Sequence, residues 1–77
     1  MIEKNEDLKI ILAQRIGRLI ASARERKKWS PYTLAKRSGV DAGHIAKIED
    51  GFLCPRIDTL QKLCKALEIN IVLPLTI

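Results

Sequence analysis

Apolar residues follow helical spacing along most of this chain and change to simple alternation at its end. The spacing predicts a long helix over residues 8–27 with one apolar stripe, and another helix over residues 56–68. Gly17 lies inside the first helix, where glycine costs about 1 kcal/mol relative to alanine, so we expect another helix to approach closely there. Residues 1–7 are predicted to be a frayed lead-in.

Residues 30–51 predict two short helices joined by a tight turn. Ser30 is a good N-cap with Pro31 after it, Gly39 can end the first helix in the left-handed conformation, and Asp41 can cap the second. The expected inward positions are Leu34, Ala35, Val40, Ile45 and Ile48. A connection of about three residues containing glycine is typical of a helix-turn-helix, although a helical hairpin in any small bundle shares this pattern.

The last nine residues are uncharged, largely β-branched and alternating, which predicts a strand over residues 69–77. The positions in phase are Ile69, Ile71, Leu73, Leu75 and Ile77. A lone strand has no partner in its own chain, so we expect it to pair with the same strand of a second copy about a two-fold axis. The alternative is that this tail folds over its own core. The predicted fold is therefore a single all-α domain over residues 1–77, with a short C-terminal β-strand.

The net charge of +5 is concentrated in the middle of the chain. Residues 15–37 hold eight basic side chains and one acidic one, whereas the first nine residues are slightly acidic and the last nine carry no charge. A basic region of this kind is typical of a domain that lies on phosphates. An ordinary solvated surface with several lysines is the alternative.

Other function classes find little support in the composition. Two cysteines far apart, Cys54 and Cys64, and a single histidine, His44, do not make a metal site, so no metal or cofactor is expected. No nucleophile lies beside a base and no glycine-rich loop could hold phosphates, so no enzyme is expected. The chain has no signal-peptide pattern and no membrane span, and we expect a cytoplasmic protein.

Four stretches carry a resemblance to a known family: IGRLIASARERKKWS, LAKRSGV, HIAKIEDG and P-x-x-D-T-L-x-K-L-C-K-A-L. With these stretches, residues 16–67 resemble the Xre/Cro-type helix-turn-helix family, the lambda-repressor-like DNA-binding domains. The resemblance implies four or five helices and two-fold dimers on double-stranded DNA. It places the helix from Asp41 in the major groove and the helix from Ser30 across the backbone. It also implies a structural ion pair between Arg24 and Glu49.

The chain departs from the family where that family contacts DNA. Pro31 replaces a glutamine that usually contacts a phosphate, and Gly43 offers no side chain to a base. The expected base-contacting residues are Ala42, His44 and Lys47, with Ala42 limited to a thymine methyl group. His44 can instead cap or pack, and Lys47 can instead touch phosphate. The expected phosphate-contacting residues are Ser30, Tyr32, Thr33, Lys36, Arg37 and Arg56.

Two functions of different classes follow. The first is a small homodimeric transcriptional regulator, a repressor or autoregulator similar to antitoxins or to restriction–modification controllers. It would be a bacterial or phage-encoded protein that binds double-stranded DNA and is associated with the nucleoid. The alternative is a protein-interaction module that neutralises a toxin or binds another partner, with weak or non-specific DNA binding. With few side chains available to read bases, we expect DNA shape and dimer spacing to supply much of the specificity.

Overall fold

Residues 2–71, with side chains from residue 7 onward, are the part of the chain that the computed structural model describes. Within it the chain forms four α-helices: α1 (Ile2–Arg26), α2 (Pro31–Ser38), α3 (Ala42–Glu49) and α4 (Ile57–Leu67). Each corresponds to a helix that the sequence predicts, and the all-α prediction is confirmed for these residues.

The start of α1 differs from the prediction. The helix begins at Ile2, so residues 2–7 belong to it and do not form a frayed lead-in. The apolar stripe marks only the part of a helix that packs against other elements. The preceding residues include glutamate and lysine, which are good helix formers, and contain neither glycine nor proline to stop the helix.

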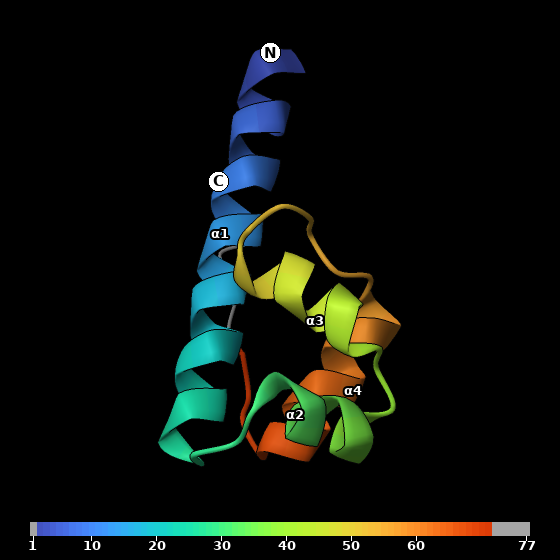
Figure 1. Cartoon of the computed structure of the whole chain (residues 1–77). Coiled ribbons are helices and arrows are strands. Elements are labelled where there is room, and N and C mark those ends of the chain that lie inside the picture. Colours follow the sequence, from blue (N-terminus) through green and yellow to red (C-terminus); the bar gives the residue numbers. More distant parts are fainter. Residues whose placement is uncertain (1, 72–77) are drawn as a thin grey trace.

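The helix α1 sets the shape of the molecule. Its N-terminal turns extend beyond the other three helices, which lie beside its C-terminal part (Figure 1). The longest dimension is 40 Å against 22 and 20 Å for the other two, and a helix of 25 residues alone spans about 37 Å. The helices α3 and α4 contact α1, and α2 packs on α3 and α4.

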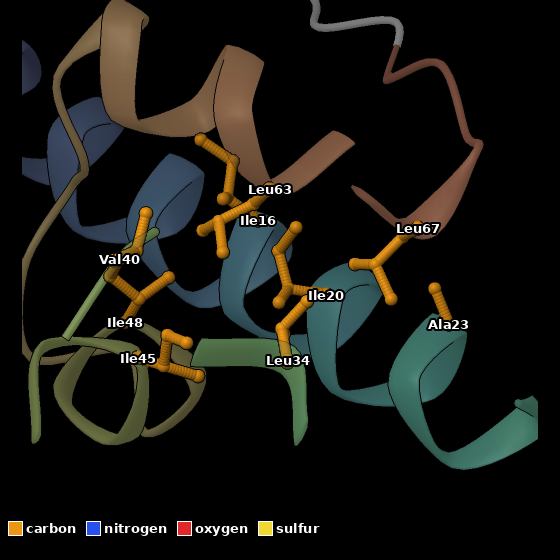
Figure 2. Close-up of a cluster of buried hydrophobic side chains, with 9 residues drawn as sticks. All are labelled: Ile16, Ile20, Ala23, Leu34, Val40, Ile45, Ile48, Leu63 and Leu67. Atoms are coloured by element: carbon orange, nitrogen blue, oxygen red, sulfur yellow. The ribbon is translucent and has the colours of Figure 1, made fainter. Parts of the chain in front are cut away.

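One apolar cluster holds the four helices together (Figure 2). Its buried members in the described part are Ile16, Ile20, Ala23, Leu34, Val40, Ile45, Ile48, Leu63 and Leu67. Of the expected inward positions, Leu34, Val40, Ile45 and Ile48 are buried, and Ala35 is half-buried against the cluster. Because α3 places both Ile45 and Ile48 in the core, the packing fixes which of its faces points outward.

Gly17 lies where α1 and the end of α3 touch. A Cβ atom at this position would collide with the carbonyl oxygen of Ile48 and come within 2.9 Å of that of Glu49. This confirms the expectation that another helix approaches α1 at Gly17. The glycine therefore allows the backbones of α1 and α3 to meet directly. Any larger residue would improve the helix propensity of α1 but would block this contact.

The predicted C-terminal strand falls mostly outside the described residues, which end at Ile71. Leu73, Leu75 and Ile77 are therefore beyond them, and residues 69–71 are not in a strand within the part described. Ile69 and Ile71 are half-buried and pack against the core of their own chain. Pairing between two copies remains a prediction.

Candidate nucleic-acid interface

The turn between α2 and α3 is fixed by two capping residues. Gly39 takes the left-handed conformation, with φ 78°, and its N–H donates to the carbonyl oxygen of Ala35 at 2.9 Å. The carboxylate of Asp41 accepts from the backbone N–H groups of Gly43 at 3.0 Å and His44 at 3.3 Å. These caps satisfy backbone groups that a helix end leaves free and set the direction in which α3 leaves the turn.

The helix α3 has one buried and one exposed face. Ile45 and Ile48 are completely buried, whereas His44 and Lys47 are exposed. His44 and Lys47 are three residues apart on a helix, so their side chains are neighbours on its surface. The structure thus places two of the three expected base-contacting residues together on the outer side of α3.

Short side chains surround this pair on α3. Ala42, the third expected base-contacting residue, is half-buried beside the turn, while Gly43 and Ala46 are exposed. Sequence reasoning missed two exposed residues here, Ala46 and the acidic Asp50 that follows the helix. Their phase relative to the buried isoleucines is the signal that could have identified them.

Five of the six expected phosphate-contacting residues lie on α2 or at its N-cap. Tyr32 is 78% exposed, and Lys36 and Arg37 are exposed near the C-terminal end of the helix. The hydroxyl of Ser30 accepts from the N–H of Thr33 at 3.2 Å and lies 3.1 Å from the Thr33 hydroxyl. Ser30 and Thr33 are therefore brought together by helix capping, and their hydroxyl groups already have a partner in this structure.

Arg37 and Lys27 both lie over the indole ring of Trp29. The guanidinium carbon of Arg37 lies 4.8 Å from the centre of the indole ring, and Lys27 Nζ lies 5.1 Å from it. Cation–π contacts at exposed positions contribute about 0.5–1 kcal/mol each. Sequence reasoning did not assign Trp29 or Lys27 to this surface. Trp29 lies in a loop and Arg37 lies on a helix eight residues later, so hydrophobic periodicity does not predict their contact.

Arg56 belongs to a different element from the other phosphate-contacting candidates. It precedes α4 as its N-cap residue but makes no side-chain capping hydrogen bond. Its side chain is 88% exposed, and its ion-pair partner in the described part is Asp58, 3.8 Å away. Arg56 is thus exposed to solvent beside Asp58, and the structure does not bring it together with the candidates on α2.

Arg24 and Glu49 form a bidentate ion pair that fixes the end of α3. Arg24 Nε donates to one carboxylate oxygen of Glu49 at 2.8 Å, and its Nη2 donates to the other at 2.9 Å. A third donor, Nη1, reaches the carbonyl oxygen of Trp29 at 2.8 Å. The hydrogen bond and charge of Glu49 raise the pKa of Arg24 against the opposing effect of burial. The pair thus ties α1, the end of α3 and the start of α2 together.

Among the side chains that the structure describes, those of residues 7–71, no group of three or more from histidine, cysteine, aspartate or glutamate could hold a metal ion. Among the helices of residues 2–71, none is long and apolar enough to cross a membrane.

Comparison with known proteins agrees with this geometry. Residues 20–73 match the family model described as Helix-turn-helix. A protein of Sinorhizobium fredii (strain NBRC 101917 / NGR234), named as an uncharacterized HTH-type transcriptional regulator y4dL, is 37% identical over 60 residues. The match covers 78% of this chain but only 31% of that relative. No solved structure matches the chain. The family match spans most of the chain, including α2, the turn, α3 and α4, and the chain belongs to the Helix-turn-helix family.

Proposed function

We propose that this chain binds double-stranded DNA as a transcriptional regulator, with α3 in the major groove and α2 across the backbone. The observation that carries the proposal is the orientation of α3. The core holds Ile45 and Ile48 on one side, which leaves His44 and Lys47 exposed on the other. A major groove about 12 Å wide admits an α-helix presented in this way. The family match and the name of the relative support a regulatory role.

We infer a sparse readout of bases. Lys47 can donate to guanine O6 or N7, His44 can donate or accept, and Ala42 can meet a thymine methyl group. Gly43 and Ala46 offer no polar group, and Asp50 repels phosphate. DNA shape and the spacing between half-sites are then left to supply the remaining specificity.

Selection from a random pool of duplex DNA at near-physiological salt tests this proposal. A palindrome with half-sites about one helical turn (~34 Å) apart, or a simple multiple of it, is the expected result for a two-fold dimer that reads sequence. Binding without any enriched sequence would show that the domain holds only the DNA backbone. A complete absence of DNA binding would contradict the proposal.

Lys47→Ala is expected to relax specificity at one position of the selected half-site. Loss of a base contact should weaken binding to the best site by about tenfold and leave binding to unrelated DNA almost unchanged. Titration of both DNAs with the variant and the wild type measures the difference. Equal weakening on both would assign Lys47 to phosphate instead of a base.

Replacing Lys36 and Arg37 together by alanine is expected to weaken binding to all DNA sequences alike. Loss of two phosphate contacts should lower affinity at least about tenfold and reduce the salt slope by about two. The matched control replaces Lys62 and Lys65, two exposed lysines of α4, which lowers the net charge equally. Thermal unfolding of both variants shows whether losing the contact between Arg37 and Trp29 destabilises the domain. Equal losses in the two variants would contradict the docking through α2.

We also propose that the regulator acts as a homodimer, with the strand predicted over residues 69–77 pairing between copies. We infer that it acts as a repressor or autoregulator, of the antitoxin-like or restriction–modification controller-like kind, and expect the selected palindrome to overlap the promoter of the gene it controls. Footprinting on that promoter with RNA polymerase distinguishes exclusion of the polymerase from its recruitment. Ser30, Tyr32, Thr33 and Arg56 are the remaining candidates for phosphate contacts in such a complex.

A second candidate function is binding of a protein such as a toxin. The observation that favours it is an exposed apolar patch where α1 extends beyond the core. Ile10 is 53% and Phe52 79% exposed, and both line a shallow hollow that also includes Leu53 and Cys54. Protein binding would become the main function if the chain fails to bind DNA in the selection but co-purifies with a co-expressed partner, and if replacing Phe52 abolishes that co-purification.

A further inference from the structure

Trp29, the one tryptophan of the chain, lies in the loop between α1 and α2 with two cations over its ring. The guanidinium carbon of Arg37 is 4.8 Å from the ring centre, and Lys27 Nζ is 5.1 Å from it. The ring is half-buried, and Trp29 packs against the apolar cluster that holds the helices together. The loop lies where α1 ends close to α2 and to the last turn of α4 (Figure 1). The indole thus connects the core with two charged side chains at the surface.

Both polar groups of the Trp29 backbone are bonded to Arg24. The N–H of Trp29 donates to the carbonyl oxygen of Arg24 at 3.2 Å, and its carbonyl oxygen accepts from Arg24 Nη1 at 2.8 Å. Arg24 is itself held by the carboxylate of Glu49 at the end of α3. These hydrogen bonds and the packing of the ring restrict the motion of Trp29. The indole is therefore a fixed surface on which a longer, more mobile side chain can be ordered.

The two cations over the ring differ in what else they contact. Lys27 Nζ lies 3.0 Å from a carboxylate oxygen of Glu68, and the Lys27 side chain is 29% exposed. Arg37 is exposed, and no ion pair in the part of the chain that the structure describes includes it. The charge of Lys27 is therefore compensated within the domain, whereas the charge of Arg37 is available to an anion from outside.

A guanidinium group over an indole ring is ordered without losing its hydrogen-bond donors. The attraction is between its positive charge and the electrons of the ring face, so its N–H groups remain able to donate to the oxygens of a phosphate. A carboxylate partner would also order the side chain, but it would occupy those donors. Long side chains lose rotamer freedom when they bind a ligand, and a side chain that is ordered beforehand loses less. The contact with Trp29 therefore prepares Arg37 for binding an anion.

We propose that Trp29 is a positioning residue for DNA binding, which holds the guanidinium group of Arg37 ready to contact a phosphate. The inference rests on the proposed function, in which α2 lies across the DNA backbone, and it adds a residue that acts through Arg37. A phosphate is the ligand because Arg37 belongs to α2 and because the donors of arginine match phosphate oxygens. Contacts with phosphate carry no sequence information. Trp29 should therefore affect the affinity for all DNA sequences alike.

The affinity of a Trp29→Leu variant for duplex DNA tests this role. Leucine keeps an apolar side chain against the core but offers no ring, so binding should weaken about two- to fivefold, the loss expected for one cation–π contact. The salt slope should equal that of the wild type, because Arg37 still reaches its phosphate, although less readily. Trp29→Phe, which keeps a ring, should recover most of the affinity, and far-UV circular dichroism checks that both variants fold. Wild-type affinity in a folded Trp29→Leu variant would overturn the proposal.

A double-mutant cycle with Arg37→Ala distinguishes positioning from a general structural role. Arg37→Ala alone should reduce the salt slope by about one, because one phosphate contact is lost. In that background Trp29→Leu should weaken binding no further, since no guanidinium group remains to be positioned. The matched control is Tyr32→Leu, because Tyr32 is an exposed aromatic residue of the same helix, and its effect should be the same with and without Arg37. A full Trp29→Leu effect in the Arg37→Ala background would overturn the proposal.

Proton NMR of the protein without DNA gives a readout that separates this inference from the function on which it rests. The ring current of Trp29 should shift the side-chain protons of Arg37 upfield, and Trp29→Leu should remove the shift. Unshifted Arg37 protons in a wild-type protein that binds DNA would overturn the positioning role and leave the proposed function intact. Shifted Arg37 protons in a wild-type protein that binds no DNA would confirm the contact with the ring but overturn the proposed function, and the positioning role with it.

Discussion

Replacing Gly17 by alanine is expected to lower the free energy of unfolding by about 3 kcal/mol. Alanine improves helix propensity by about 1 kcal/mol, but its Cβ would strike the carbonyl oxygen of Ile48 and crowd that of Glu49. Overpacking usually costs about 1–3 kcal/mol and occasionally more. Because the colliding atoms belong to a backbone that cannot rotate away, we expect a cost of about 4 kcal/mol here, which leaves a net loss of about 3 kcal/mol after the gain in propensity. For a domain of this size the midpoint of thermal unfolding should fall by about 12–24 °C.

Gly43→Ala is the matched control, because it makes the same change on another helix. A Cβ there meets only a side-chain oxygen of Asp41, at 3.0 Å, and no backbone of a neighbouring helix. We expect the free energy of unfolding to change by less than about 1 kcal/mol, as the gain in propensity offsets the disturbed cap. Urea unfolding of both variants gives the comparison. A Gly17→Ala variant as stable as the wild type would show that α3 can move away from α1 at little cost.

The features that sequence reasoning predicted best are those set by neighbouring residues. The caps at Ser30, Gly39 and Asp41 depend on hydrogen bonds to groups at most four residues away, so their residue types indicate their conformation. The outer face of α3 followed from the phase of Ile45 and Ile48, because a helix that buries two positions necessarily exposes the opposite ones. Fold class and orientation of the candidate site were therefore predictable without a structure.

The features that escaped prediction depend on contacts between distant elements or on weak boundary signals. The stacking of Arg37 on Trp29 requires knowledge of how separate elements meet. The start of α1 at Ile2 escaped because no glycine, proline or cap marks the boundary. The contact at Gly17 was predicted only in part. The low helix propensity of glycine indicated a close approach, but the sequence did not identify Ile48 as the partner.

Breaking the Arg24–Glu49 pair is expected to destabilise the domain by an amount that depends on which partner is removed. Arg24→Met should cost about 3 kcal/mol, because it leaves the carboxylate of Glu49 and the carbonyl oxygen of Trp29 without their donors. Glu49→Leu should cost about 2 kcal/mol, since Arg24 keeps its bond to Trp29. The double variant should lose about 3 kcal/mol, which gives a coupling energy of about 2 kcal/mol.

Denaturant unfolding of the four proteins in this cycle measures the coupling, and a second ion pair provides its control. Lys27 Nζ lies 3.0 Å from Glu68, but the Glu68 side chain is 79% exposed, so Glu68→Gln should cost less than about 1 kcal/mol. The side chains of Arg24 and Glu49 are 14% and 11% exposed, which shields their charges from solvent. Additive single effects in the Arg24–Glu49 cycle would mean that packing alone holds the end of α3. Strong coupling would mean that this ion pair sets the position of α3 relative to α1. In that case both single variants should also bind DNA more weakly under conditions in which they remain folded, because α3 carries the proposed base contacts.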